Sequence, residues 1–116
     1  MSEENVQITI STREQDNRSI VEVSGEVDVH EAPTLDAELS GLIEAGNVNV
    51  IVDFTNVEFL DSTGLGVLVK GLKRAREHDG SLTVVATADR IVKVFRITGL
   101  DSVIGVHATV SDALAG

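Results

Sequence analysis

A nearly continuous apolar run, NVIVDF at residues 49–54, constrains the fold of this chain more than any other feature. A strand exposed on one face alternates apolar and polar residues, so an unbroken run indicates a strand covered on both faces. Helically spaced apolar residues follow it, and a second run of the buried type, SLTVVA at residues 81–86, comes after them. A strand, a helix and a strand in this order favour parallel pairing through a crossover. We therefore predict an α/β fold.

The beginning of the chain predicts a different kind of pairing. VQITIS at residues 6–11 alternates apolar and polar residues from Val6 onward, which is typical of a strand covered on one face. Turn residues follow in EQDNRS, at residues 14–19, and SIVEVSGEV at residues 19–27 indicates a second strand. The short gap predicts an antiparallel hairpin. The sheet is thus expected to be mixed, with the hairpin followed by β-α-β units and helices packed against it.

Two helices are predicted in the first two thirds of the chain. Pro33 suits the first turn of a helix whose apolar residues begin at Ala32, and Gly46 is the expected C-cap glycine. A later helix follows the run at residues 49–54. Its predicted apolar face consists of Leu65, Leu68, Val69, Leu72 and Ala75.

The last third of the chain predicts shorter elements. Asp89 is expected to cap a third helix, and Gly99 is expected to end it. Val103–Val106 indicates a short strand, and Ser111 is a candidate cap for a final helical turn. The predicted order is β-β-α-β-α-β-α-β-α without a repeat or a linker. Residues 1–116 are therefore expected to form a single domain.

Charge and composition argue against several classes of function. Nineteen acidic residues against nine basic ones give a net charge of −10, which disfavours binding to nucleic-acid phosphates. The absence of cysteine excludes disulfides and thiolate metal sites. The opening MSEENVQITI is acidic and polar, unlike a signal peptide, and no apolar run reaches the ~18 residues of a membrane span. We expect a soluble, cytoplasmic protein that binds neither membranes nor nucleic acid.

The stretch FLDSTGLGVL at residues 59–68 places an acid, two hydroxyls and two glycines between apolar residues. A serine-hydrolase elbow reads G-x-S-x-G, and around Ser62 its first glycine is missing. His78 would lie roughly 24 Å along the helix that Ser62 starts, so it cannot act as the base. His30 precedes a predicted helix and could approach. A small hydrolase that uses Ser62 and His30 is thus an alternative with an incomplete motif.

The sequence contains no complete motif for a cofactor or a metal ion either. Neither G-x-x-x-x-G-K-[ST] nor G-x-G-x-x-G is present, so a phosphate-binding loop is not indicated. Asp28, Asp53 and Asp61 are too scattered in the sequence to define metal ligands. A phosphorelay receiver needs a lysine near a later strand end, whereas Lys93 falls on a predicted helix. We predict no cofactor, no metal and no catalytic residue.

With these classes of site set aside, the remaining feature is a hydroxyl group at the start of the helix that follows the run at residues 49–54. Asp61, Ser62 or Thr63 can cap that helix by accepting a backbone N–H, and on these residues alone a cap is the simpler interpretation. A phosphate on Ser62 could also be held there, by free N–H groups and the positive end of the helix dipole. Gly64 and Gly66 would let a partner's backbone approach closely, although tight packing of the helix on the sheet would explain them equally.

Four stretches together resemble the STAS-domain anti-sigma factor antagonists, the anti-anti-sigma factors of bacterial partner-switching systems. DSTGLGVLV, preceded by the strand VIVDF and the linker TNVEFL, resembles the phosphorylation segment of this family. SGEVDVHEAPTL resembles its G-E-[ILV]-D segment at the first helix, and GSLTVVA resembles the strand after the phosphorylation segment. RIVKVFRITGLDSVI resembles its [LV]-F-x-[IM]-[TS]-G-L helix end. The likeness covers nearly the whole chain.

This resemblance implies a binding module and not an enzyme. The unphosphorylated form would bind an anti-sigma factor, a serine kinase of the GHKL type, and so release the sigma factor. The kinase would phosphorylate Ser62 rather than Thr63, and a metal-dependent Ser/Thr phosphatase would reverse this. Asp28 would be the acid near the acceptor that contributes to the kinase interface. The partner-binding residues that the resemblance implies are Asp28, Asp61, Ser62, Thr63, Gly64 and Gly66.

The family also contains domains with other tasks. STAS domains occur as transporter tails and as scaffold modules of stressosomes, so a constitutive scaffold subunit of a signalling complex is an alternative. No membrane segment or additional domain is predicted in this sequence, and a stand-alone antagonist is therefore the expectation that fits best.

Overall fold

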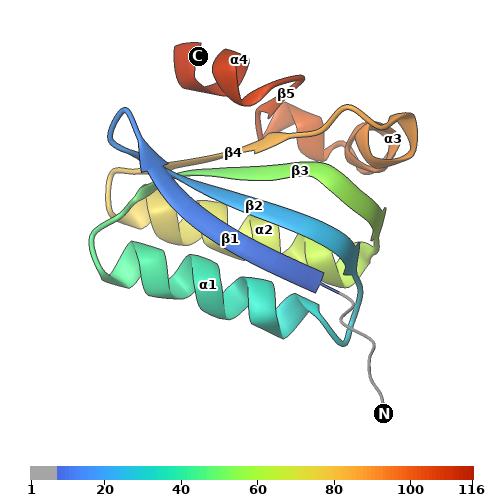
Figure 1. The fold of residues 1–116 in the computed structure, drawn as a ribbon, viewed down its shortest axis with the longest axis horizontal. Coiled ribbons are helices and arrows are strands. Elements are labelled where there is room, and N and C mark those ends of the chain that lie inside the picture. The colour runs from blue at the N-terminus through green and yellow to red at the C-terminus, as the bar shows by residue number, and fades with distance from the viewer. Residues whose placement is uncertain (1–7) are drawn as a thin grey trace.

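The computed structural model describes residues 8–116, and these form one five-stranded sheet in the order β1-β2-β3-β4-β5. The antiparallel pairing of β1 with β2 and the parallel pairing of all the others confirm the predicted mixed sheet (Figure 1). Its central strand, β3, contains the apolar run from which the α/β prediction started. The strands are β1 Ile8–Gln15, β2 Arg18–Val27, β3 Asn49–Leu60, β4 Ser81–Val85 and β5 Val106–His107.

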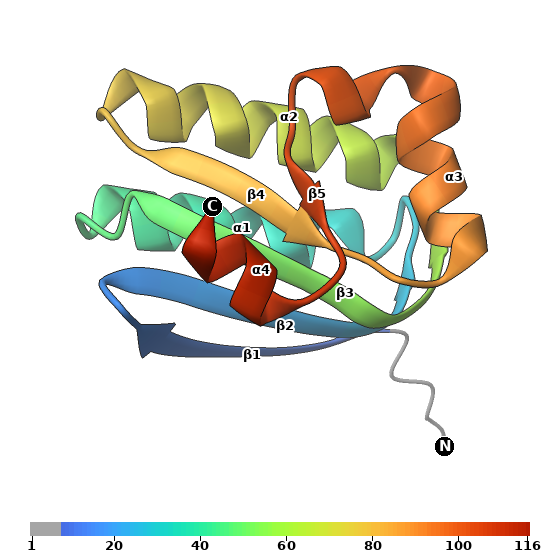
Figure 2. The same ribbon diagram turned by 90° about the horizontal axis from the view of Figure 1, so that it is seen from above.

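Helices cover the two faces of the sheet unequally. α1 and α2 lie side by side on one face and enclose the main core, while α4 lies on the other (Figures 1 and 2). Beneath α4 a small separate cluster contains Ile20, Ile51 and Val85. No helix within residues 8–116 is long and apolar enough to cross a membrane. The helices are α1 Ala32–Glu44, α2 Ser62–Glu77, α3 Asp89–Thr98, the 3₁₀ helix η1 Leu100–Ser102 and α4 Val110–Ala115.

The turn of the hairpin is tighter than predicted. Only Asp16 and Asn17 leave the strands, with φ of 55° and 64°, and Gln15 already pairs with Arg18. Two consecutive residues with positive φ make the two-residue turn whose twist matches that of paired strands. Aspartate and asparagine tolerate this backbone better than most residues, which is why six residues were not needed. Val6, the first apolar residue of the predicted strand, lies outside the described residues.

Strand β3 is longer than predicted, and this correction positions the functional site. TNVEFL, expected to be a linker, continues the strand to Leu60 because β2 pairs with it as far as Val27. Two register shifts, between Glu22 and Ser24 and between Gly25 and Glu26, accompany this extension. As a result, β2 and β3 end side by side at the same edge of the sheet.

Glycines end two helices as predicted. Gly46 has φ of +99° after α1, and the N–H groups of Gly46 and Asn47 donate to Ile43 and Leu42. This pair of bonds is a Schellman motif, which satisfies the last carbonyls of a helix. Gly99, with φ of +78°, ends α3 in the left-handed conformation.

Several details near the helix ends were predicted wrongly. Asp89 is the first residue of α3, and the preceding Ala88 occupies the cap position. Thr109 and not Ser111 caps α4, because its hydroxyl accepts the N–H of Asp112 at 3.0 Å. The last strand is β5 at residues 106–107, since residues 103–105 of the stretch expected to form it continue η1 as a turn and a bend. Adjacent cap-type residues compete for such positions, and sequence spacing cannot rank them.

Candidate functional site

The ends of β2 and β3 bring two acidic segments together. Val27 and Leu60 are partners in the parallel register, and each is followed directly by an aspartate. The backbone N–H of Asp61 donates to the carbonyl of Val27 at 3.2 Å, which continues the pairing past the last strand residue. Asp28 and Asp61, which are far apart in the sequence, therefore leave the sheet as neighbours at one edge.

Asp61 is the N-cap of α2. Its Oδ1 accepts the backbone N–H of Thr63 at 2.9 Å and that of Gly64 at 3.2 Å. The sequence left three residues open for this role, and the structure assigns it to Asp61. The expectation that a phosphate on Ser62 would find free N–H groups needs correcting, since the cap carboxylate already occupies two N–H groups of the first turn.

Ser62 and Thr63 present their side chains to solvent at the start of α2. Neither hydroxyl makes a hydrogen bond with any residue of the 8–116 segment. Ser62 is the first helical residue, so its hydroxyl stands at the corner where the strand end turns into the helix. This hydroxyl is accessible to an enzyme and is not needed to hold the turn together.

Asp28 shapes the turn that leads into α1. Its Oδ1 accepts the backbone N–H groups of His30 and Glu31, each at 3.0 Å. Its carbonyl oxygen accepts from Glu31 and Ala32 at 3.1 Å and 2.8 Å. Asp28 therefore acts as a local turn residue. The side chain of Asp28 is only partly buried, so it also adds charge at the edge of the sheet where β2 and β3 end.

The two glycines of the motif occupy different environments. Gly64 is buried, and a Cβ there would lie 2.6 Å from Leu60 Cδ1 and 2.8 Å from Val27 Cγ1. At Gly66, which is exposed, a Cβ would meet nothing within 4 Å. Gly64 thus lets α2 pack on the strand ends and has no surface to offer a partner. Gly66 lies in the open, where close approach by a partner is feasible.

Two exposed apolar residues beside the site were missed by the sequence analysis. Val29 is 59% exposed and follows Asp28, while Phe59 is 47% exposed and lies two residues before Asp61. The other two phenylalanines, Phe54 and Phe95, are fully buried. A half-exposed aromatic side chain is unusual in a chain with three aromatic residues, and the aromatic residue within FLDST was the available signal.

The hydrolase alternative gains no support from the geometry. His30 is exposed, and its only hydrogen bond to another described residue is the one that its backbone N–H donates to Asp28. Its imidazole makes no bond to Ser62. Within residues 8–116, no group of three or more His, Asp or Glu side chains is arranged to hold a metal ion.

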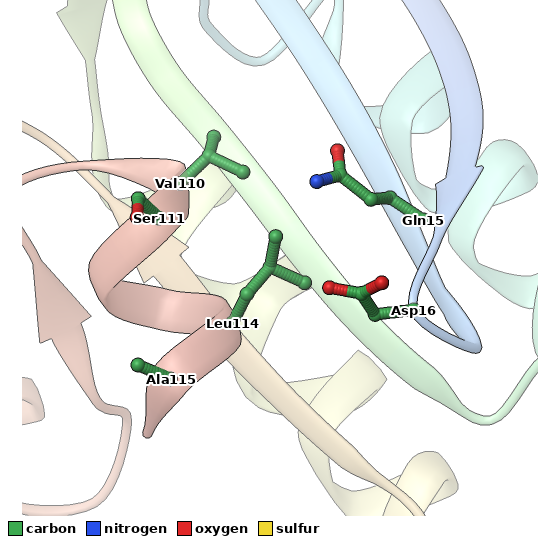
Figure 3. A pocket seen from close by; sticks show the side chains of 6 residues that line it. All are labelled: Gln15, Asp16, Val110, Ser111, Leu114 and Ala115. Atoms are coloured by element: carbon green, nitrogen blue, oxygen red, sulfur yellow. The ribbon is translucent and has the colours of Figure 1, made fainter.

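Two clefts lie away from the candidate site. One of about 380 Å³ opens between the hairpin turn and α4, where Val110 and Leu114 lie across from Gln15 and Asp16 (Figure 3). Another of about 140 Å³ also adjoins the hairpin turn. Residues at the carboxyl ends of β2 and β3 line neither cleft, because the hairpin turn lies at the opposite end of β2.

Comparisons with known proteins agree with this geometry. The family model of the STAS domain matches residues 9–113. An anti-sigma-B factor antagonist of Staphylococcus aureus is 37% identical over 100 residues, which cover 86% of this chain and 93% of that protein. The corresponding antagonist of Bacillus subtilis is 35% identical over 101 residues, with 87% and 92% covered. A crystal structure of an anti-sigma factor antagonist from Mycobacterium paratuberculosis superimposes with a TM-score of 0.86 at 31% identity, covering 93% and 92% of the two chains.

Proposed function

Because this chain belongs to the STAS-domain family, we propose that it is an anti-sigma factor antagonist controlled by phosphorylation of Ser62. The observation that carries this proposal is the exposed Ser62 hydroxyl at the start of α2, beside the ends of two paired strands. The antagonist relatives are similar over nearly their whole length, which supports carrying over their role. In this role the chain binds a partner and catalyses no reaction.

The proposed cycle has two states. Unphosphorylated protein binds an anti-sigma factor that is also a serine kinase of the GHKL type, and the sigma factor is released. The kinase then phosphorylates Ser62, the complex dissociates, and a metal-dependent Ser/Thr phosphatase restores the binding form. The partner-binding surface includes Asp28, Asp61, Thr63 and Gly66. Gly64 supports it from inside the fold, because it is buried against β2 and β3.

Electrostatics at the strand ends favour such a switch. A phosphate adds about −1.5 to −2 charges at neutral pH. It would stand beside the carboxylates of Asp28 and Asp61, and the latter already binds two N–H groups that could otherwise receive the phosphate. The new charge would therefore stay largely uncompensated and would have to be desolvated in a bound complex. Reversing a 99:1 population takes about 5.5 kcal/mol, and a doubly charged group in a tight interface can supply much of it.

Phosphate transfer tests the assigned acceptor directly. With the cognate kinase and ATP, wild-type protein and Thr63→Ala should each gain one phosphate by intact-mass spectrometry, and Ser62→Ala should gain none. Thr63→Ala is the matched control because it removes the neighbouring exposed hydroxyl. Equal incorporation into wild type and Ser62→Ala would show that the acceptor is another residue.

Phe59 should contribute apolar contact to the same interface. Interfaces gain affinity from aromatic side chains that become buried on binding, and Phe59 has about half of its surface available. Phe59→Ser should weaken binding of the anti-sigma factor about tenfold, measured by calorimetry. Ile97→Ser is the control, because Ile97 is 75% exposed but lies on α3. Equal losses from both variants would count against a specific role for Phe59.

A further inference from the structure

One stripe of helix α2 continues outward from the candidate phosphorylation site. Its residues recur at alternating spacings of four and three, and all of them are exposed. Such spacing keeps side chains on a single face of a helix. At 1.5 Å per residue the stripe is about 21 Å long. From the start of the helix, the stripe consists of Ser62, Gly66, Val69, Lys73 and Arg76.

The cations of α2 fall into two groups. Lys70 and Arg74 face α1: the Nζ of Lys70 lies 2.9 Å from Asp36 Oδ2, and Arg74 Nη1 donates to Ser40 Oγ at 2.7 Å. These contacts join the two helices. Lys73 and Arg76, on the stripe, form no ion pair with a residue of the described chain. Holding α1 against α2 therefore explains the first pair of cations but not the second.

Charge is distributed unevenly along the chain. Residues 62–99 contain seven of the nine basic residues and three of the nineteen acidic ones, a net charge of +4. The remaining residues carry two basic and sixteen acidic side chains, a net charge of −14. The stripe contains no carboxylate, although most of the chain is rich in them. A uniformly acidic surface that only ensured solubility would not be divided in this way.

Val69, in the middle of the stripe, departs from the sequence prediction. Its spacing placed it on the buried face of the helix, yet it is 37% exposed. A β-branched residue adds little to helix propensity, so exposure at this position does not serve the helix itself. Positions where sequence patterns fail in this manner are often functional surfaces.

We propose that the anti-sigma factor docks along this whole stripe and that carboxylates of the partner recognise Lys73 and Arg76 at its far end. The inference rests on the proposed function and specifies the chemistry of the partner, namely a small apolar patch bordered by acidic side chains. Ser62, Gly66 and Val69 would meet the apolar patch. Lys73 and Arg76 would meet the acidic border and would guide the partner into the correct orientation.

The two ends of the stripe act independently. Lys73 lies 11 residues beyond Ser62, which corresponds to about 17 Å along the helix. The Debye length is about 10 Å at 0.1 M salt, so a phosphate on Ser62 is largely screened from Lys73. Phosphorylation would therefore break contacts at one end of the stripe without neutralising the cations at the other. Electrostatic guidance acts mainly on the association rate, and loss of close packing acts on dissociation.

Charge reversal with a charge-matched control tests this inference. Full-length, unphosphorylated Lys73→Glu should associate with the purified anti-sigma factor about tenfold more slowly than wild type at about 0.05 M salt, and the difference should shrink at about 0.5 M. Lys73→Arg should behave like wild type. Arg13→Glu changes the net charge equally, but Arg13 pairs with Ile20 of the cluster beneath α4, on the face away from α2. Its association rate should fall less than about twofold.

The outcomes separate this inference from the function on which it rests. Equal rates for Lys73→Glu and Arg13→Glu would overturn the inference, because net charge alone would then explain the effect. If Ser62→Asp abolishes binding while Lys73→Glu leaves the rate unchanged, the switch stands and the extended docking surface is wrong. No binding by wild type would overturn both. Additive losses in the Ser62→Asp/Lys73→Glu double variant would support two independent ends.

Discussion

Ser62→Asp should weaken binding of the anti-sigma factor by about 100-fold or more, whereas Ser62→Ala should bind as tightly as wild type. A factor of 100 corresponds to about 2.8 kcal/mol, within the range expected for a like charge placed in a packed interface. The aspartate adds a negative charge beside Asp28 and Asp61, and the cap bonds of Asp61 leave few N–H groups to receive it. Affinities from calorimetry with purified partner check both values.

A control for charge at a helix start is available elsewhere in the chain. Ser111 is an exposed hydroxyl residue in the first turn of α4, on the face of the sheet opposite α2. Ser111→Asp therefore introduces the same charge in a similar local setting and should leave affinity unchanged. If wild type, Ser62→Asp and Ser62→Ala all bind equally, Ser62 takes no part in binding the anti-sigma factor. A constitutive scaffold would then explain the chain better, and it should form large assemblies in size-exclusion chromatography.

Periodicity made most of the fold predictable. The apolar run of β3 and the helical spacing of α1 reflect burial, which one-dimensional patterns record directly. Details that depend on competition between neighbours were not predictable in the same way. Asp61, Ser62 and Thr63 all have side chains that cap helices, and only the backbone geometry selects Asp61. Likewise, TNVEFL contains polar residues, and it forms a strand because β2 extends beside it.

The sequence identified the segment that contains the candidate site, but it did not show the role of each residue in that segment. In the sequence Gly64 and Gly66 are equivalent glycines, two residues apart, in one short motif. In the fold they differ because successive helical residues point about 100° apart, so that two residues separate the sheet side from the solvent side. Residue patterns alone could not place Asp28 beside the motif; the family resemblance implied it, and the pairing of Val27 with Leu60 gives the physical reason. Long-range pairing of this kind has no signature in a single sequence.

Replacing Gly64 or Gly66 by alanine should change the stability of the protein in opposite directions. Gly64→Ala should lower the free energy of unfolding by about 1–2 kcal/mol, since overpacking against Leu60 and Val27 outweighs the gain in helix propensity. Gly66→Ala should raise it by about 0.4–1 kcal/mol, since a methyl group there meets open space and restricts the unfolded chain. Urea unfolding of both variants measures these changes, and equal stability would contradict the packing assigned to Gly64.

The variant that gains stability, Gly66→Ala, should lose affinity for the partner. If a partner's backbone lies against the exposed stripe of α2, the methyl group of Gly66→Ala occupies space that the partner needs, so this more stable variant should bind at least about tenfold more weakly. A loss of affinity in a stabilised protein cannot be attributed to unfolding. Gly41→Ala is the matched control, because Gly41 lies within α1 and a Cβ there also meets nothing within 4 Å. Unchanged affinity in Gly66→Ala would move the partner away from α2, whereas a loss confined to this variant would place it against the helix.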